Sequence, residues 1–261
     1  MGKGEITGYI DVAQVTLYVF WIFFFGLIFW LRREDRREGY PLESDPTGKV
    51  KDIGAGILFA RPKTFRVRTG ETFTAPNFRR DARPVAARRV GSWPGAPLVP
   101  TGNPLVDGVG PAAWAERADR PDLTWDGRNK IVPARSDAHY TVASGDPDPR
   151  GMSVIGADGK VAGTVTDIWV DRAEHVVRYL EMTSASPGTG PLLVPMNLTK
   201  IVGNDRKGRS VKVRSILAEQ FEQAPRIKSA ESVTFLEEDR ICAYFAGGAL
   251  YATPARTEPL L

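Results

Sequence analysis

The chain has 261 residues, of which 42% are hydrophobic and 25% are charged, and this is enough apolar material for one or two folded domains. Lys and Arg exceed Asp and Glu by 35 to 31, and a net charge of +4 is too small for a surface devoted to nucleic acid. One cysteine and two histidines exclude an intramolecular disulfide and a closed zinc site made of sulfur and nitrogen ligands.

An apolar segment at residues 12–31 contains no Asp, Glu, Lys or Arg. Twenty helical residues that rise 1.5 Å each span a bilayer core of about 30 Å, so the segment predicts a transmembrane helix. A buried helix of a soluble protein is the alternative, but such helices are usually shorter and seldom end in a cluster of arginines. Arg32, Arg33, Arg36 and Arg37 follow the segment, and the positive-inside rule places them in the cytoplasm and residues 1–11 on the far side of the membrane.

Residues 32–114 are predicted to form an extended region on the membrane surface. Ten prolines between positions 41 and 111 leave no room for long helices. Between residues 32 and 89, 15 basic residues face 8 acidic ones, so we expect the four arginines and their neighbours to attract anionic lipid headgroups. Trp30 and Tyr40 are expected to act as interfacial anchors. A merely solvated linker is the alternative interpretation.

Short strands are predicted in the remaining domain, residues 115–261. Apolar runs bounded by turn residues predict strands at 153–155, 161–170, 175–183, 192–195, 198–202 and 210–213, with Asp158-Gly159 as a hairpin turn. Strands at this spacing favour a small antiparallel barrel. Two helices are expected after the strands, at 216–223 and 233–244, and Ala246-Gly247-Gly248 supplies the stop of the second.

Six ionisable residues lie on or beside the predicted central strands: Asp167, Asp171, Glu174, His175, Arg178 and Glu181. On an extended strand such residues usually form a solvated face. A proton relay is the alternative, because closely spaced carboxylates raise one another's pKa and can exchange protons near neutral pH. The residues alone leave both interpretations open. Since the sequence contains neither a glycine-framed serine nor a phosphate-binding loop, it predicts neither a hydrolase nor a nucleotide site.

Six stretches spread over the chain have unusual sequences and occur in a fixed order. They are residues 33–42 (REDRREGYPL), 62–65 (PKTF), 101–114 (TGNPLVDGVGPAAW), 129–131 (NKI), 167–171 (DIWVD) and 236–248 (LEEDRICAYFAGG). Together they resemble the H-subunit family of the purple bacterial photosynthetic reaction centre. The resemblance implies a single N-terminal transmembrane helix and a mainly-β cytoplasmic domain of the PRC-barrel type with short C-terminal helices. It therefore agrees with the strand pattern.

The resemblance also implies a place in a complex at the bacterial inner membrane, with the N-terminus in the periplasm. In this family the H subunit is non-catalytic and binds no cofactor of its own. It caps the cytoplasmic face of the L and M subunits and keeps bulk water from their quinones. The complex carries bacteriochlorophyll, bacteriopheophytin, carotenoid, quinones and a non-haem iron. Core light-harvesting antenna polypeptides and membrane lipids are further implied partners, whereas nucleic acid is not.

Site residues follow from the same resemblance. A carboxylate near the quinone face belongs to a proton network in this family, and Glu174 occupies the matching place after Trp-Val-Asp. We therefore expect Glu174 to relay protons toward the secondary quinone, with Asp171 in support and Arg178 holding the carboxylates ionised. Where some members have a pair of histidines at the proton entrance, this chain has Asp126-Gly127-Arg128. Asp126 is a candidate proton collector in their place.

A membrane-tethered PRC-barrel adaptor that binds RNA or an acidic protein is the alternative function. Such an adaptor needs a basic surface on its soluble domain. The basic excess fades after residue 89, where 19 Lys and Arg face 21 Asp and Glu. The charge distribution therefore favours the reaction-centre interpretation.

Overall fold

The computed structural model of the protein describes residues 4–7, 10–40, 42–49, 59–68, 70–77, 81–184, 191–204 and 208–257. The chain forms two compact units, one of residues 1–82 and 92–96, the other of residues 83–91 and 97–261. The second unit thus includes part of the region that we predict to be extended on the membrane surface. The division of the sequence into four regions, with a boundary after residue 114, stays a prediction.

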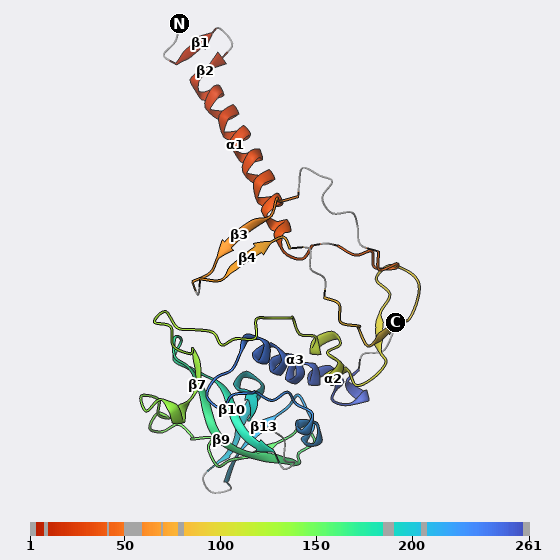
Figure 1. The fold of residues 1–261 in the computed structure, drawn as a ribbon, viewed down its shortest axis with the longest axis vertical. Helices are drawn as coiled ribbons and strands as arrows, with labels where there is room; N and C mark the ends of the chain where they lie inside the picture. The colour runs from red at the N-terminus through yellow and green to blue at the C-terminus, as the bar shows by residue number, and fades with distance from the viewer. Residues whose placement is uncertain are drawn as a thin grey trace. The chain divides into compact units, whose positions relative to one another are not determined.

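A long helix dominates the first unit (Figure 1). A short pair of strands, β1 (Glu5–Thr7) and β2 (Ile10–Asp11), leads into α1 (Val12–Glu34), whose first turn is capped by the Asp11 carboxylate. No side chain of α1 is buried, and most are exposed. Within the described residues it is the one helix long and apolar enough to cross a membrane, and it extends three residues past the predicted end at residue 31.

A hairpin follows α1 in the first unit. Strands β3 (Lys63–Arg66) and β4 (Thr72–Ala75) pair antiparallel, so that Phe65 lies opposite Phe73. The turn is closed by a hydrogen bond from the Val67 amide to the Glu71 carbonyl. This hairpin is not among the elements predicted from the sequence.

The second unit begins with short elements. Strands β5 (Ala87–Arg89) and β6 (Leu98–Pro100) form a two-stranded ladder. Helix α2 (Pro104–Asp107) has Asn103 as its N-cap and ends at Gly108, whose φ of +68° suits a glycine. No described helix between residues 38 and 114 exceeds four residues, as the prolines predict.

A seven-stranded sheet forms the body of the second unit. Its strands run in the order β11-β10-β9-β8-β13-β12, with β7 also paired to β9, and all pairs are antiparallel except β8 with β13. The strands are β7 (Ile131–Pro133), β8 (Ser153–Ile155), β9 (Val161–Asp171), β10 (Val176–Ser184), β11 (Leu192–Pro195), β12 (Thr199–Asn204) and β13 (Gly208–Val213). The predicted strands and the turn at Asp158-Gly159 are confirmed, with shifts of one or two residues at six of the twelve strand ends.

The core of the second unit is a single cluster of buried apolar side chains. It joins Trp169 on β9, Leu180 on β10 and Val211 on β13 to Phe245 on α3 (Phe235–Tyr251), and each of these is fully buried. Figure 1 shows α3 running alongside the sheet. The mainly-β domain with one C-terminal helix and one N-terminal apolar helix confirms the predicted fold class.

Two helix predictions at the C-terminal end need correction. Helix α3 does not stop at Gly247 and Gly248 but continues to Tyr251. A Cβ on Gly247 would lie 2.5 Å from that of Ala112, and one on Gly248 would lie 2.5 Å from the Ser215 carbonyl oxygen. The glycines therefore permit close packing inside the helix. The helix predicted at 216–223 is a shorter 3-10 helix, Ala218–Glu222.

Candidate functional site

A tight turn between β9 and β10 forms the centre of the candidate site. Strand β9 ends at Asp171 and β10 begins at Val176, one residue later than predicted. His175 closes the turn with a φ of +55°, and its amide donates to the Asp171 carbonyl over 2.8 Å. The turn thereby brings Asp171, Glu174 and Arg178 together, as we expect from the sequence.

Asp171 is fully buried within this turn. Its carboxylate accepts hydrogen bonds from the amides of Ala173 (2.9 Å) and Glu174 (3.0 Å) and from Arg178, whose Nη2 lies 3.1 Å away. Burial alone would raise the pKa of Asp171, but these hydrogen bonds and the nearby Lys130 charge outweigh it and hold the pKa below its ordinary value. Asp171 is therefore ionised at neutral pH and acts as a fixed negative charge.

Two cations connect this charge to further carboxylates. Arg178 Nη2 lies 3.0 Å from Glu174, and Lys130 Nζ lies 3.6–3.7 Å from Asp122, Asp171 and Glu174. Burial lowers the pKa of Lys130, but the three carboxylates outweigh it and raise the pKa above its ordinary value. We call these five residues the carboxylate cluster. Its three anions and two cations leave a net charge of −1, and its Glu174 side chain is 54% exposed.

A polar cavity of about 460 Å³ borders the carboxylate cluster. Its lining includes Asp171, Arg178, Tyr179, Glu238 and Cys242. The Tyr179 hydroxyl donates to Glu238 Oε2 over 2.9 Å and lies 3.7 Å from the Cys242 sulfur. Burial raises the pKa of Glu238. The cavity thus joins a permanently ionised carboxylate to one that holds its proton more readily than usual.

The sequence analysis assigns no role to Lys130, Asp122 or Glu238. Lys130 precedes β7 and Glu238 lies on α3, so both reach the turn only through the tertiary fold. The one signal was that stretches 129–131 and 236–248, which resemble the H-subunit family, contain Lys130 and Glu238.

Asp167 and Glu181 belong to a separate group. Arg135 Nη1 lies 3.1 Å from Asp167 and 2.8 Å from Glu181, and Trp169 Nε1 donates to Glu181 over 2.8 Å. Asp167 is buried at 4% exposure. This group ties the segment after β7 to the central strands, so Asp167 and Glu181 do not form the solvated face that is usual for strand residues.

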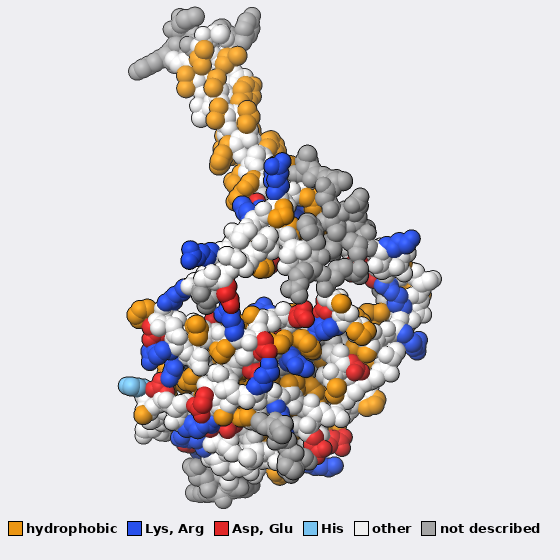
Figure 2. Space-filling view, in the orientation of Figure 1, with side chains coloured by type: hydrophobic (Ala, Val, Ile, Leu, Met, Phe, Trp, Pro, Cys, Tyr) orange, Lys and Arg blue, Asp and Glu red, His pale blue; other side chains and the backbone are white. Residues whose placement is uncertain are grey.

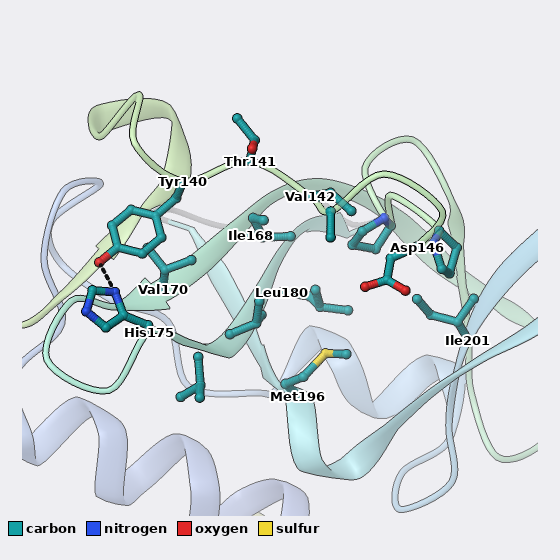
Figure 3. A pocket seen from close by; sticks show the side chains of 15 residues that line it. Tyr140, Thr141, Val142, Asp146, Ile168, Val170, His175, Leu180, Met196 and Ile201 are labelled. Carbon is teal, nitrogen blue, oxygen red and sulfur yellow. Dashed lines mark hydrogen bonds between the residues drawn. The ribbon is translucent and has the colours of Figure 1, made fainter.

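His175 faces a different cavity, which is mainly apolar and has a volume of about 360 Å³. Its Nδ1 lies 3.1 Å from the Tyr140 hydroxyl at one end of this cavity, and Asp146 lies at the other end (Figure 3). Ile168 and Leu180 lie between them. The six ionisable residues are therefore divided among three environments.

Asp126 makes its contacts apart from the carboxylate cluster. Its carboxylate accepts from the Thr124 hydroxyl and pairs with Arg128 Nε at 2.6 Å. The hydrogen bond from Thr124, aided by Arg128, holds the pKa of Asp126 below its ordinary value. A lowered pKa does not favour proton uptake at neutral pH, and the role of Asp126 as a proton collector stays a prediction.

The residues expected at the membrane surface lie at the end of α1 or just after it. Trp30 is exposed, and Arg32 lies 3.8 Å from Asp35. The Arg36 guanidinium lies 5.8 Å from the Tyr40 ring centroid. Arg33 is half-buried, and the Arg37 side chain is only 10% exposed because it bonds to neighbouring protein groups. A lipid role for all six residues stays a prediction.

Among the described residues, no group of three or more His, Cys, Asp or Glu side chains is arranged to hold a metal ion. Comparison with protein families gives two matches. The model described as "Photosynthetic reaction centre, H-chain N-terminal region" matches residues 4–136, and the PRC-barrel domain matches residues 142–216, which include β8 to β13. The first match alone covers just over half of the chain. The chain belongs to the photosynthetic reaction centre H-chain family.

Proposed function

We propose that this chain caps the cytoplasmic face of the L and M subunits of a reaction centre and assists proton delivery to the secondary quinone. The H-chain family, whose members are structural subunits of a complex that contains pigments and quinones, supports this proposal. The finer roles are supported by the chemistry of the carboxylate cluster.

The observation that carries the proton role is the contrast between Asp171 and Glu174. Asp171 is buried, fully hydrogen-bonded and ionised, whereas Glu174 is half exposed on the same turn and shares the cations Arg178 and Lys130. Protonation of Glu174 would bring the net charge of the cluster from −1 to 0. Glu174 can therefore exchange a proton with solvent and with a neighbouring acceptor, while Asp171, Lys130 and Arg178 keep their own charges.

The remaining roles follow from the architecture that the family implies. With the arginine-rich end of α1 in the cytoplasm, the PRC-barrel domain lies on the side where the quinone takes up protons. A folded domain there excludes bulk water and limits proton entry to defined routes. Antenna polypeptides and lipids surround such a complex. The adaptor alternative has less support, because the H-chain match covers the basic region that an adaptor would use for binding.

The proton role is tested with Glu174→Gln in the complete reaction centre. We expect the second, proton-coupled electron transfer to the secondary quinone to slow by roughly tenfold, about 1.4 kcal/mol in the barrier. Flash-induced absorbance changes of the semiquinone measure this rate between pH 6 and 9. Glu219→Gln is the matched control, because Glu219 is an exposed carboxylate outside the cluster. Kinetics identical to the parent protein across this range would refute the relay.

Membership of a pigment complex is tested independently by co-purification. A tagged chain in mild detergent should bring with it near-infrared absorption bands of bacteriochlorophyll and bacteriopheophytin that bleach reversibly in light. The Glu174→Gln variant should retain the same spectrum, because the side chain is exposed and makes no core contact. A colourless preparation from pigmented cells would support the adaptor instead.

A further inference from the structure

The β3–β4 hairpin is fixed to the end of α1 by side-chain contacts. Arg37 Nη1 donates to the carbonyls of Arg61 and Ala75, each over 2.8 Å, and its Nε donates to Glu34 over 2.7 Å. Lys63 Nζ lies 3.2 Å from the same Glu34 carboxylate. The start of β3 and the end of β4 are thus held beside the C-terminal end of α1, and Figure 1 shows the hairpin projecting sideways from there.

One face of this hairpin is aromatic and exposed. Phe65 and Phe73 lie opposite each other with ring centroids 6.3 Å apart, yet they remain 42% and 45% exposed. Val67 continues the same face and is also exposed. Of the eight strand residues, Ala75 is the one that is buried. A two-stranded hairpin without a core is marginally stable in water, so this face requires a covering partner.

The hairpin is also basic. Between residues 61 and 73, Arg61, Lys63, Arg66 and Arg68 face a single acidic residue, Glu71. Arg66 and Arg68 are exposed and form no ion pair with any residue in the described ranges. The seven residues from Arg61 to Val67 span at most about 23 Å even when fully extended, so these charges stay near the end of α1. An anionic surface beside the helix end would complement them.

We propose that this hairpin rests on the lipid bilayer, with Phe65 and Phe73 among the headgroups and with Arg66 and Arg68 bound to anionic lipid phosphates. Aromatic rings favour the interfacial layer, and basic side chains next to a membrane attract anionic lipids. Arg66 leaves the ribbon on the face opposite Phe65, but a ribbon of two strands is narrow and a long arginine side chain reaches around its edge. The inference rests on α1 crossing the bilayer and is independent of the role of Glu174.

The occupant of the aromatic face is tested by photocrosslinking in the complete complex. The photoreactive residue benzoylphenylalanine replaces Phe65 or Phe73, and the complex is reconstituted into vesicles of phosphatidylcholine and phosphatidylglycerol. Mass spectrometry after irradiation should find lipid adducts at these positions at least fivefold above those at Trp125, an exposed aromatic residue of the second unit. Adducts with another protein subunit would show a protein partner and overturn the proposal.

The charge requirement is tested in the same preparation. The double variant Arg66→Gln and Arg68→Gln should reduce the phosphatidylglycerol share of the adducts at position 73 to its share in the vesicle. The control double variant, Lys200→Gln and Arg214→Gln, removes two exposed cations of the second unit and should leave that share unchanged. An unchanged share in the Arg66 and Arg68 variant contradicts specific binding of anionic lipid. Quinone kinetics in this variant should match the parent protein, so failure here is distinct from failure of the proton relay.

Discussion

The two units of this protein obtain their stability from different sources. In the first unit the buried described residues are all small: Ala60, Ala75, Pro76 and Ala96. In the second, large side chains such as Trp169, Phe221 and Phe245 are completely buried in one core. Because burial of apolar surface is the main driving force of folding, the second unit is stabilised by its own buried core. The first unit instead presents its apolar groups outward to whatever surrounds it, as Figure 2 shows along the helix.

Amide exchange gives the largest expected contrast between the two units. In the full chain in detergent micelles, we expect the amides of β9 and β10 to exchange at least about a thousandfold more slowly than those of β3 and β4, a difference of about 4 kcal/mol in opening free energy. Hydrogen–deuterium exchange read by mass spectrometry measures both. Equal protection would break the comparison, because the hairpin would then have stability of its own.

A pair of glycine substitutions sharpens the comparison. Gly248→Ala should destabilise the second unit by about 1–3 kcal/mol, because the added Cβ would collide with the Ser215 carbonyl and this strain exceeds the gain in helix propensity. Gly26→Ala on α1 is the control, since nothing lies within 4 Å of the added Cβ. Thermal unfolding followed by circular dichroism measures the loss. A neutral Gly248→Ala would mean that α3 can move away from the sheet.

Asp171→Asn tests whether the second unit depends on its buried charge. We expect a loss of about 2–4 kcal/mol at pH 7, because Arg178 and Lys130 lose their buried anion. The pKa of Asp171 is lowered on folding, so its contribution is present above the ordinary pKa of about 3.9 and disappears as the pH falls through the folded value. Denaturant unfolding at several pH values should therefore show the two proteins converging in acid. A gap that persists in acid would assign the loss to packing.

Glu238→Gln should have the smallest effect and the opposite sign. Burial raises the pKa of Glu238, so the folded state binds the proton more tightly than the unfolded state does. The contribution of Glu238 to the free energy of unfolding is therefore fully present below the ordinary pKa of Glu, and it is lost as the pH rises through the folded pKa. The variant should unfold at a slightly higher temperature at pH 8 and at the same temperature at pH 4. A lower unfolding temperature at pH 8 would show that the Tyr179 bond needs the carboxylate.

Local signals were sufficient for much of the fold. Strands 153–155 and 192–195 match the structure residue by residue, because short apolar runs between turn residues allow few alternatives. The predicted end of α3 is wrong because, in the sequence, a glycine pair that ends a helix cannot be distinguished from one that permits close packing. Only the tertiary positions of Ala112 and Ser215 distinguish the two. In the β3–β4 hairpin, Phe65 and Phe73 alternate with polar residues, but so short a pattern between prolines is equally compatible with an irregular extended chain.

The candidate site was predictable where it is local. Asp171, Glu174 and Arg178 are brought together by one turn within eight residues, so their proximity follows from the strand pattern. Lys130 and Glu238 come from segments more than 40 residues away in sequence, and nothing near them reveals their partners. Whether a carboxylate becomes a fixed charge or a proton carrier depends on its burial and its hydrogen bonds, which only the folded structure defines.

The packing of the α3 glycine pair against earlier segments of the chain implies an order of events during synthesis. Residues 112 and 215 form the surface that receives Gly247 and Gly248, and both are made before α3 is. At roughly 5–20 residues per second, the 200 residues between the end of α1 and the start of α3 take about 10–40 s to translate. The anchor is therefore available for insertion well before the barrel can close. During that interval the nascent sheet exposes the apolar surface that α3 later covers. The chain is then most prone to aggregation.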